Sequence, residues 1–521
     1  MIEFNYDVVI IGGGTGGVCA AAAFLKAKYR IAVIEKRDVL GGTTTNGLVS
    51  TWAEGVNLDF HIEMFNELSK TGDTMGKLED SWLPGNLSKK GKSNIIKFNP
   101  IRIAEYYKSV FDNSPNPDID IYLNSVFEQV EMQSEKQIGA IFVSAPVGKM
   151  KFSAKFFIDA SGDGILCRKA AECLCISPDP YYLGRDAKER FNESLAMEKN
   201  DSSELNEPSL LFRVTNENCN VKLYQYIDSV YAVYQSDRER IKIDDAVFLD
   251  DSAFKACNYD LSKIYIEKPN YIKVDGYRYS INANGHEVSL CNPMSGAGVR
   301  GDEILKYSHD ENAQYSFLKQ RTQEYWKYIK YSLVLAQRRG ETGYWDRSGW
   351  LVSDYTFNIT DEFAKICGIR ESYRIKCKYM LSQNDMICDV TSCTDIEGER
   401  FIAIGCHNID MHNQKGLSNA DIDTFNKQYL CPYGIRYDCF VPDFLSNVLV
   451  GCKAFGASQL AVSSARIVKT ISQIGWGCGN AIRLCLDKNK SDTALDDSLI
   501  PILQSEQYTN FIKSYSIINN Q

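Results

Sequence analysis

Histidine and proline are scarce in this chain, and its cysteines are not spaced as a disulfide framework or a metal cluster requires. Five histidines and 13 prolines occur among 521 residues. None of the 17 cysteines forms a Cys-x-x-Cys pair, and dense disulfide frameworks are a property of small secreted domains. We therefore expect reduced thiols, a cytoplasmic protein and no iron–sulfur centre.

The sequence also lacks an excess of positive charge and a long apolar run. It carries 58 Lys and Arg against 67 Asp and Glu, a net charge of -9, whereas a nucleic-acid partner requires a basic surface. Its apolar stretch at residues 8–25 contains five glycines and is too irregular for a membrane-spanning helix. With 44% hydrophobic residues, we expect a globular protein with no nucleic-acid partner and no membrane span.

The first 35 residues follow the pattern of a βαβ unit. Residues 7–11 (DVVII) are an apolar run that ends in glycines, which predicts a buried parallel strand. Residues 18–28 are rich in alanine and predict a helix, and residues 30–35 (RIAVIE) predict a second strand.

The turn between the first strand and the helix matches the dinucleotide-binding pattern G-x-G-x-x-G. It consists of Gly12, Gly13, Gly14, Thr15, Gly16 and Gly17. The first glycine permits the tight turn, the third lets the backbone approach a pyrophosphate, and the last allows close packing of helix on strand. Glu35 lies eighteen residues beyond the last glycine, where a carboxylate accepts hydrogen bonds from an adenosine ribose and disfavours a 2'-phosphate.

A second glycine-rich segment, residues 40–48 (LGGTTTNGL), follows the second strand directly. Backbone and hydroxyl groups at this place are suited to a flavin dinucleotide, whereas an NAD enzyme has no evident need of them. A non-redox NAD protein is disfavoured on the same ground. Candidate contacts with the cofactor therefore include Lys36, Gly42, Thr43 and Thr44.

Five segments resemble the FAD-dependent oxidoreductase family of the glutathione-reductase-like and fumarate-reductase-like flavoproteins, and they occur in the order that the family has them. The segments are residues 7–21 (DVVIIGGGTGGVCAA), 35–49 (EKRDVLGGTTTNGLV), 156–171 (FFIDASGDGILCRKAA), 368–386 (GIRESYRIKCKYMLSQNDM) and 437–482, which ends in GWGCGNAI.

The resemblance implies contacts with FAD that lie outside the glycine turn. Ala160, Gly162 and Asp163 are expected to approach the cofactor, and the backbone of Val126 is expected to meet the adenine. A branch of the family with covalent flavin carries a histidine at the place of Thr43. The threonine therefore implies FAD that is bound non-covalently.

The segment 437–482 implies a helix whose N-terminus points at the flavin pyrimidine ring. Reduction places negative charge at that end of the flavin, and a helix N-terminus or a cation there stabilises it. We count Gly451 and Gly479 among the cofactor contacts. Arg466 is a catalytic candidate near the flavin or the substrate, and the alternative is a cation on the surface of the helix.

These observations predict an α/β fold with a Rossmann-like FAD-binding domain of the glutathione-reductase type, in three ββα layers, and an inserted α+β substrate or cap domain. The middle of the chain differs in composition, being rich in Tyr, Asn, Asp and Lys. The expected ranges are 1–55, 100–175 and 400–487 for the FAD-binding domain, 56–99 and 176–399 for the cap, and 488–521 for a C-terminal tail.

Local pattern predicts several further elements. Residues 118–124 and 127–132 are expected to form a strand pair, residues 447–451 a buried strand, and residues 464–486 one long helix. In the middle of the chain, the pattern predicts strands at 245–249, 271–274 and 277–281, and helices at 303–321 and 324–335.

Few histidines are candidates for acid–base catalysis. His286 lies in a strand-like, glycine-containing stretch of the expected cap, where it is either an acid or base or a structural histidine. His407 and His412 lie among polar residues that could face the active site. Their spacing of five residues is wrong for a metal pair on one helical face, so we expect no metal.

Two arginines flank Glu371 in the segment 368–386. Arg370 is a catalytic candidate, because Arg370 and Arg374 offer forked donors that could clamp a substrate carboxylate. The alternative is an ion-pair network with Glu371 that holds the cap domain.

The sequence thus predicts an enzyme, an FAD-dependent oxidoreductase that transfers hydride or electrons between flavin N5 and a small organic substrate. No second strand-borne G-x-G-x-x-G provides for NAD(P)H, and the spaced pair Cys388 and Cys393 lies far from the first motif, which disfavours a disulfide reductase. A flavin monooxygenase and an FAD-binding electron-relay subunit are the alternatives. An electron-transfer partner or a homo-oligomer is compatible with each.

Overall fold

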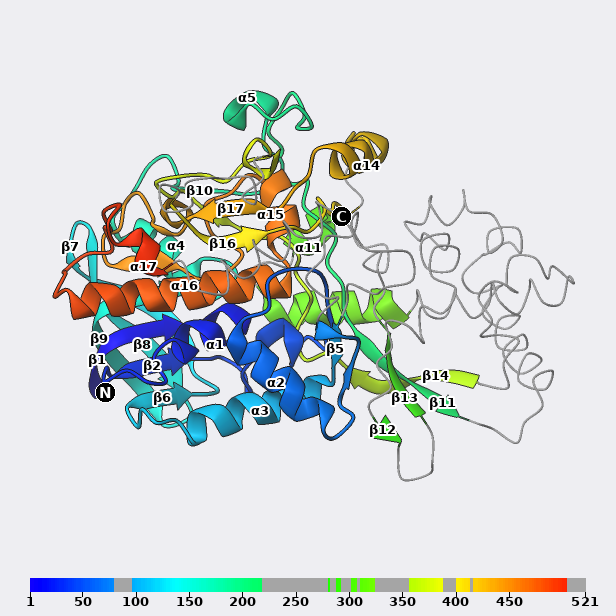
Figure 1. The fold of residues 1–521 in the computed structure, drawn as a ribbon, viewed down its shortest axis with the longest axis horizontal. Coiled ribbons are helices and arrows are strands. Elements are labelled where there is room, and N and C mark those ends of the chain that lie inside the picture. The colour runs from blue at the N-terminus through cyan, green and yellow to red at the C-terminus, as the bar shows by residue number, and fades with distance from the viewer. Residues whose placement is uncertain are drawn as a thin grey trace, which may run out of the picture. The chain divides into compact units, whose positions relative to one another are not determined.

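The computed structural model describes residues 1–78, 96–217, 280–281, 287–291, 301–306, 310–323, 356–387, 400–412 and 416–503. Figure 1 shows their elements, coloured along the chain. By its contacts the chain divides into two compact units. The first comprises Met1–Asn46, Thr51–Leu205 and Glu371–Gln521, and the second comprises Gly47–Ser50 and Asn206–Arg370.

The described residues of the first unit form a seven-stranded mixed sheet. Its five parallel strands are, in spatial order, β6 (Ile119–Tyr122), β2 (Ile31–Ile34), β1 (Ile2–Ile11), β9 (Gly148–Asp159) and β18 (Val448–Val450). In chain order this arrangement reads 3-2-1-4-5, so the strand order reverses between β1 and β9. The strands β2 and β18 are buried along their whole length, as parallel strands covered on both faces are.

An antiparallel pair, β7 (Val126–Ser134) and β8 (Gln137–Ala145), extends this sheet from β9. The expected pairing of residues 118–124 with 127–132 is wrong. Strand β6 instead pairs in parallel with β2, while β7 pairs with β8. Alternating residues identified both strands, but alternation does not specify which neighbour a strand takes.

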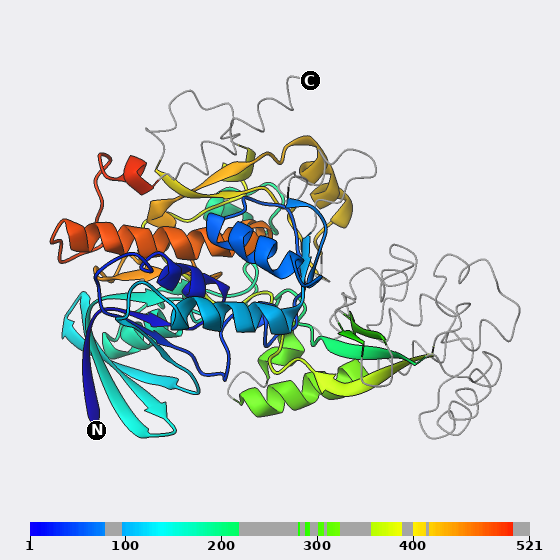
Figure 2. The same ribbon diagram turned by 60° about the horizontal axis from the view of Figure 1, so that its bottom comes forward.

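Helix α1 (Thr15–Ala22) is buried at every residue. It packs against the sheet and against α16 (Val468–Asp487), which runs beside it in both ribbon views (Figures 1 and 2). Small side chains are needed because the helix has neighbours on two sides. The helix expected over residues 18–28 therefore begins earlier, directly after the glycine turn, and ends at Ala22.

The single helix expected over residues 464–486 is two helices. Helix α15 (Gln459–Ala465) begins after Ser458, whose hydroxyl accepts a hydrogen bond from Ala461 N at 3.1 Å, as an N-cap does. Helix α16 begins after Ile467, which is extended. The break contains neither glycine nor proline, so the sequence carried no local signal for it.

Shorter elements complete the first unit. They are β3 (Thr51–Trp52), β4 (Thr74–Met75), β5 (Ile96–Phe98), β10 (Tyr181–Tyr182), β15 (Arg374–Ile375), β16 (Phe401–Gly405), β17 (Tyr433–Arg436), α2 (Asp59–Ser69), α3 (Pro100–Asp112), α4 (Ile165–Cys173), α5 (Lys188–Phe191), α14 (Asn419–Gln428), α17 (Ile500–Leu503), η1 (Gly42–Thr44), η4 (Asp385–Ile387) and η5 (Tyr437–Phe440). Within the described ranges, we find no helix that is both long and apolar enough to cross a membrane.

The second unit contains an antiparallel sheet in the order β12-β13-β11-β14. Its strands are β11 (Phe212–Glu217), β12 (Ser280–Ile281), β13 (Glu287–Cys291) and β14 (Thr356–Phe363). The expected helix over 303–321 is two helical pieces, α11 (Gly301–Leu305) and residues 311–323. The strands expected at 245–249 and 271–274 and the helix expected at 324–335 lie outside the described residues.

Candidate functional site

The glycine turn lies at the carboxyl ends of β1 and β9, where ligands of such sheets bind. Gly12 has a φ of 100°, and a Cβ on it would lie 2.4 Å from the Ala160 carbonyl oxygen. A Cβ on Gly17 would lie 1.8 Å from the Gly12 carbonyl oxygen, so the fold itself requires both glycines. Gly14 differs, because a Cβ there would meet only the Gly42 Cα, at 4.0 Å. The space in front of Gly14 is open to a ligand.

Glu35 is buried at the end of β2 and fixes the glycine turn. Its Oε2 accepts a hydrogen bond from Gly13 N at 2.7 Å, and its Oε1 accepts one from Arg37 N at 2.8 Å. Burial raises the pKa of Glu35, while the two N–H groups act in the opposite direction. Each carboxylate oxygen can accept a second hydrogen bond, so the expected contact with a ribose stays a prediction.

The second glycine-rich segment lies against the first. Gly41 N donates to the backbone of the glycine turn at 2.7 Å, and both Gly41 and Gly42 have positive φ. Thr44 Oγ1 donates to the Gly41 carbonyl at 2.9 Å, whereas Thr43 is exposed. The Asn46 Oδ1 is buried and has no hydrogen-bond partner among the described residues. A bound cofactor would supply one.

Lys453, which follows β18, brings a cation to the same edge of the sheet. Its Nζ donates to the Gly162 carbonyl at 2.7 Å. Burial lowers the pKa of Lys453, as do the nearby charges of Arg466 and Lys36, and Asp163 acts in the opposite direction. Three cations therefore lie within electrostatic range of one another, which suits a ligand that carries phosphates.

Helices α1 and α16 run parallel and in close contact. A Cβ on Gly475 would lie 2.1 Å from the Gly16 carbonyl oxygen, and one on Gly479 would lie 2.4 Å from the Ala20 carbonyl oxygen. The contact positions rise together along both helices, so both N-termini point to the same end of the sheet. Since α16 begins seven residues before Gly475 and α1 only one before Gly16, α16 extends roughly 9 Å further.

The first turn of α16 is suited to an anion. It has no capping side chain and no acidic residue, so its N–H groups and the positive end of the helix dipole are available. Thr470 Oγ1 is buried without a hydrogen-bond partner among the described residues. Lys469 in the same turn is 1% exposed. Burial lowers the pKa of Lys469 to about 7, against the attraction of Cys406 and Glu54.

Polar and charged side chains gather beside this turn in a group that we call the histidine cluster: Glu54, His407, Asp410, His412 and Arg466. His407 Nδ1 lies 2.9 Å from Glu54 Oε1, and His412 Nε2 lies 2.9 Å from Asp410 Oδ2. Arg466 Nη2 donates to the Asp410 carbonyl at 3.0 Å and to its Oδ2 at 3.1 Å. The Arg466 side chain is 11% exposed, so it is not an exposed surface cation, and its catalytic role stays a prediction.

The charges of the histidine cluster shift the pKa values of its members. Burial acts to lower the pKa of His407, but the charge and hydrogen bond of Glu54 outweigh it and raise that pKa. Burial likewise acts to raise the pKa of Glu54, and His407 reverses this. The pKa of Asp410 is lowered, because His412 and Arg466 outweigh its burial. The cluster therefore favours charged imidazole beside charged carboxylate.

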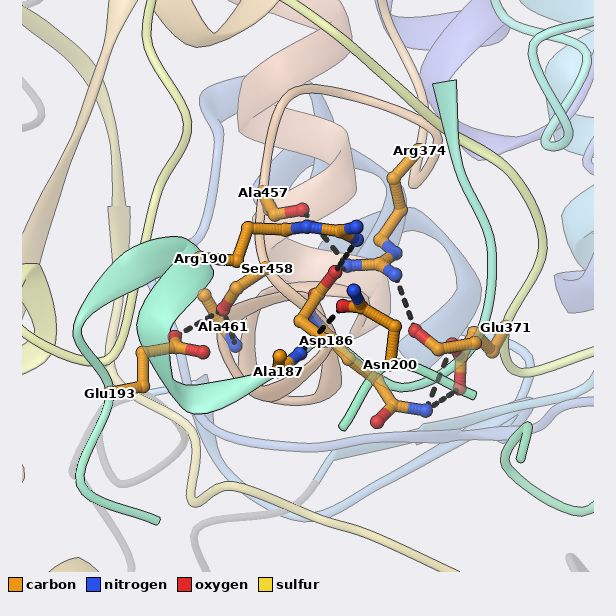
Figure 3. Close-up of polar contacts among 12 residues, drawn as sticks. Asp186, Ala187, Arg190, Glu193, Asn200, Glu371, Arg374, Ala457, Ser458 and Ala461 are labelled. Atoms are coloured by element: carbon orange, nitrogen blue, oxygen red, sulfur yellow. Dashed lines mark hydrogen bonds and ion pairs between the residues drawn. The ribbon is translucent and has the colours of Figure 1, made fainter. Parts of the chain in front are cut away.

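A second charged group, which we call the arginine network, surrounds Arg374 (Figure 3). Arg374 is 1% exposed and pairs with Asp186 at 2.5 Å. It also donates to the carbonyls of Gly184 at 2.5 Å and Ala457 at 3.2 Å. Protein oxygens thus occupy its fork, so Arg374 does not offer that fork to a substrate carboxylate.

Glu193 and Glu371 extend the arginine network. Glu193 Oε1 accepts hydrogen bonds from Ser458 Oγ and, at 2.7 Å, from Gln383 N. Burial raises the pKa of Glu193 to about 7. Gln459 Nε2 donates to both oxygens of Glu371, at 3.1 and 3.0 Å. These contacts connect the segment around Asp186 to the start of α15.

The remaining expected site residues lie in different places. Thr15 is buried at the start of α1, and Gly451 is buried at the end of β18. Val126 begins β7 and is half-exposed. Arg370 belongs to the second unit, where its Nη1 donates to the Glu207 carbonyl at 2.6 Å. His286 lies outside the described residues. The contacts of all these residues with a cofactor or substrate stay predictions.

Sequence reasoning missed three residues of the site: Glu54, Lys453 and Lys469. Lys453 and Lys469 both lie in the segment 437–482, where a lysine amid apolar and small residues is a visible signal. Lys469 was overlooked because the expected helix began before it and placed it in a helix interior. Glu54 carries no such signal, because its partner His407 is 353 positions away.

Known proteins resemble this chain to different extents. The FAD dependent oxidoreductase family model matches residues 7–506. A digeranylgeranylglycerophospholipid reductase of Methanospirillum hungatei is 33% identical over 92 residues, which are 18% of this chain and 18% of that protein. A geranylgeranyl bacteriochlorophyll reductase-like structure from Thermoplasma acidophilum covers 98% of this chain and 84% of its own at 10% identity and a TM-score of 0.37. L-proline dehydrogenase from P. horikoshii covers 31% and 23% at 20% identity and a TM-score of 0.19.

The site geometry and the family match agree on the cofactor. Gly14 leaves an open cradle at an uncapped helix N-terminus, and buried oxygens of Asn46 and Thr470 lack partners among the described residues. The residues present therefore fit a dinucleotide that reaches from α1 to α16. Because the family model spans nearly the whole chain, the expected membership of the FAD-dependent oxidoreductases is confirmed: the chain belongs to the FAD dependent oxidoreductase family and is an enzyme with FAD as its cofactor.

Proposed function

We propose that this enzyme transfers hydride or electrons between N5 of non-covalently bound FAD and a small organic substrate. The parallel packing of α1 and α16 carries the proposal, because it brings two uncapped helix N-termini to one end of the sheet. The N–H groups of α1 in front of Gly14 would hold the FAD pyrophosphate, and the first turn of α16 would hold the flavin pyrimidine ring.

The residues around α16 support a redox role for the bound flavin. FAD supplies the electron-accepting chemistry, and reduction places negative charge on its pyrimidine ring. The dipole of α16 and the buried Lys469 stabilise that charge. The histidine cluster lies beside the same turn and provides groups that can exchange protons. Thr43, in place of a histidine, supports non-covalent binding.

The finer architecture is part of the same proposal. The FAD-binding domain is of the glutathione-reductase type and is assembled from residues 1–55, 100–175 and 400–487, with the cap formed by residues 56–99 and 176–399. The 3-2-1-4-5 order of the parallel strands and the antiparallel pair β7 and β8 support this reading.

Absorption spectra of wild type and Gly14→Val test the cofactor site. The purified wild type is expected to show flavin bands at about 370 and 450 nm that pass into the supernatant after heat denaturation, as non-covalent flavin does. Gly14→Val is expected to be folded but colourless, because its Cβ meets no close protein atom while its methyl groups fill the open cradle. Gly17→Val is the matched contrast, since its Cβ collides with the Gly12 carbonyl and the fold itself should fail. Yellow Gly14→Val at full occupancy would contradict the site.

The reaction class is tested by how the flavin is reduced. A dehydrogenase or oxidase should lose its 450 nm band when a substrate alone is added without oxygen. A monooxygenase instead requires an external reductant and oxygen, and a relay subunit shows neither behaviour and copurifies with a partner. Screening alcohols, amines and their oxidised forms against anaerobic enzyme distinguishes the three, and bleaching by none of them would contradict the proposed reaction.

A further inference from the structure

His407 is held at one ring nitrogen and open at the other. Its Nδ1 lies 2.9 Å from the Oε1 of Glu54, which is buried. Among the described residues, no hydrogen-bond partner meets its Nε2, and the side chain is 19% exposed. A carboxylate that holds one nitrogen fixes the tautomer and orientation of the ring, so the other nitrogen is presented in one direction.

The backbone that carries His407 is fixed to α15 and α16. The Ser464 hydroxyl donates to the His407 carbonyl, and the Tyr433 hydroxyl lies 2.6 Å from that of Ser464. Just before His407, Ile404 exchanges two hydrogen bonds with the Gln473 side chain of α16, at 2.9 and 3.0 Å. Glu54 is adjacent to Gly55, which packs against Lys469 of the same helix. The pair is thus positioned at the first turn of α16 from two sides.

We propose that His407 is the catalytic residue that exchanges a proton with the substrate, and that Glu54 is its positioning residue. This inference rests on the proposed function, which puts the flavin at the first turn of α16. The substrate class that it implies has a hydrogen on carbon and a hydrogen on a neighbouring oxygen or nitrogen, as in a secondary alcohol or an amine.

The proton and electrons balance in such an oxidation. The C–H bond breaks, and its electron pair leaves with the hydrogen as a hydride, for which bound FAD would be the acceptor. The O–H or N–H bond also breaks, and its proton forms a new bond to His407 Nε2 as the carbon–heteroatom bond becomes double. The resulting imidazolium lies beside the Glu54 carboxylate, which stabilises its charge. In the reverse direction, His407 returns the proton.

The charged groups around His407 support this role. Glu54 and Asp410 raise its pKa and Arg466 lowers it, while Lys469 lies within electrostatic range of Glu54. The carboxylates of Glu54 and Asp410 thus stabilise the protonated imidazole, and the Arg466 cation disfavours it. The raised pKa means that His407 keeps its proton to a higher pH than a free imidazole does.

NMR of the holoenzyme labelled with ¹³C at histidine Cε1 tests the role of Glu54. Only five histidine signals are expected, and the one absent from His407→Gln is assigned to His407. In Glu54→Gln the proton affinity of His407, measured by titrating this signal, is expected to fall about tenfold or more, since a lost neighbouring charge shifts a pKa by about a unit. Glu54→Asp should restore that affinity in part. An unchanged titration in Glu54→Gln would overturn the positioning role.

The flavin midpoint potential, followed against pH by equilibration with redox dyes, tests the role of His407. A break in its slope is expected at the pH where His407 titrates, because that proton and the flavin charge interact. The break should vanish in His407→Gln and persist in His412→Gln, the matched control from the same loop.

Each outcome decides between the two proposals. A break that persists unchanged in His407→Gln, or that vanishes in His412→Gln instead, overturns the assignment of His407 while leaving the FAD enzyme intact. A wild type without reducible FAD overturns the proposed function and this inference together. Loss of the break in His407→Gln alone, with full FAD content, supports the assignment.

Discussion

The arginine network and the histidine cluster contain similar residues, but they differ in how completely the protein encloses them. Arg374 and Asp186 have side chains that are 1% and 2% exposed, and every contact of Arg374 is with protein oxygen. In the histidine cluster, His407 is 19% and Asp410 is 43% exposed, and Nε2 of His407 has no partner among the described residues.

This difference separates structural charges from those that can do chemistry. A buried ion pair that hydrogen-bonds to surrounding protein groups holds segments together, and breaking it leaves a buried charge with fewer partners. A charged side chain held on one side and open on the other can bind or exchange protons with a ligand. The same residue types therefore fall into two roles, according to how completely the protein encloses them.

The largest effect is expected from Arg374→Met. This substitution removes one of the two cations that pair with the buried Asp186 and leaves only the partly exposed Arg190, at 2.8 Å. Breaking a buried pair costs up to about 3–5 kcal/mol of folding free energy. Thermal and urea denaturation of the holoenzyme measure the loss. Lys108→Met is the control, because its ion pair with Asp112 is exposed and contributes less than about 1 kcal/mol. Equal stability of the two variants would contradict the structural role that we assign to the enclosed arginine network.

A smaller effect is expected from Glu193→Gln, which should change how the folding stability depends on pH. Burial raises the pKa of Glu193 from 4.5 to about 7, so the folded protein keeps this proton to a higher pH than the unfolded chain does. The stability it contributes is fully present below about pH 4.5 and is lost as the pH rises through about 7, a change of roughly 3 kcal/mol.

Melting temperatures at pH 5 and pH 8 measure this effect. The wild type should lose more stability between the two values than Glu193→Gln does, while the exposed control Glu131→Gln should follow the wild type. If Glu193→Gln shows the same pH dependence as the wild type, then Glu193 is not a titrating member of the enclosed network.

The smallest effect is expected from Arg466→Met, and it should appear in redox behaviour rather than in stability. Removing this cation from beside the first turn of α16 destabilises the negative charge of reduced flavin, so the midpoint potential should fall by roughly 30 mV, about 1.4 kcal/mol for two electrons. Dye equilibration at fixed pH measures it, with Arg400→Met as the control. A potential that matches the wild type would assign Arg466 to structure alone.

Local pattern predicted most of the dinucleotide-binding part of the fold. The strands at residues 7–11 and 30–35, the glycine turn between them and the position of Glu35 all appear in the structure. The break between α15 and α16 was not predicted, because neither Arg466 nor Ile467 interrupts the helical pattern. The partner of β6 was also wrong, since pairing depends on which strands pack together and not on alternation alone.

The sequence by itself determined the family, the cofactor and the turn that holds it, because a tight glycine turn and buried strands depend on residues a few positions apart. Tertiary structure alone decided which charges meet. Glu54 reaches His407 across 353 positions, and Asp186 reaches Arg374 across 188. Such contacts depend on how whole elements pack. Whether a charge is enclosed or left open to a ligand is therefore a property of the folded chain, and no local pattern records it.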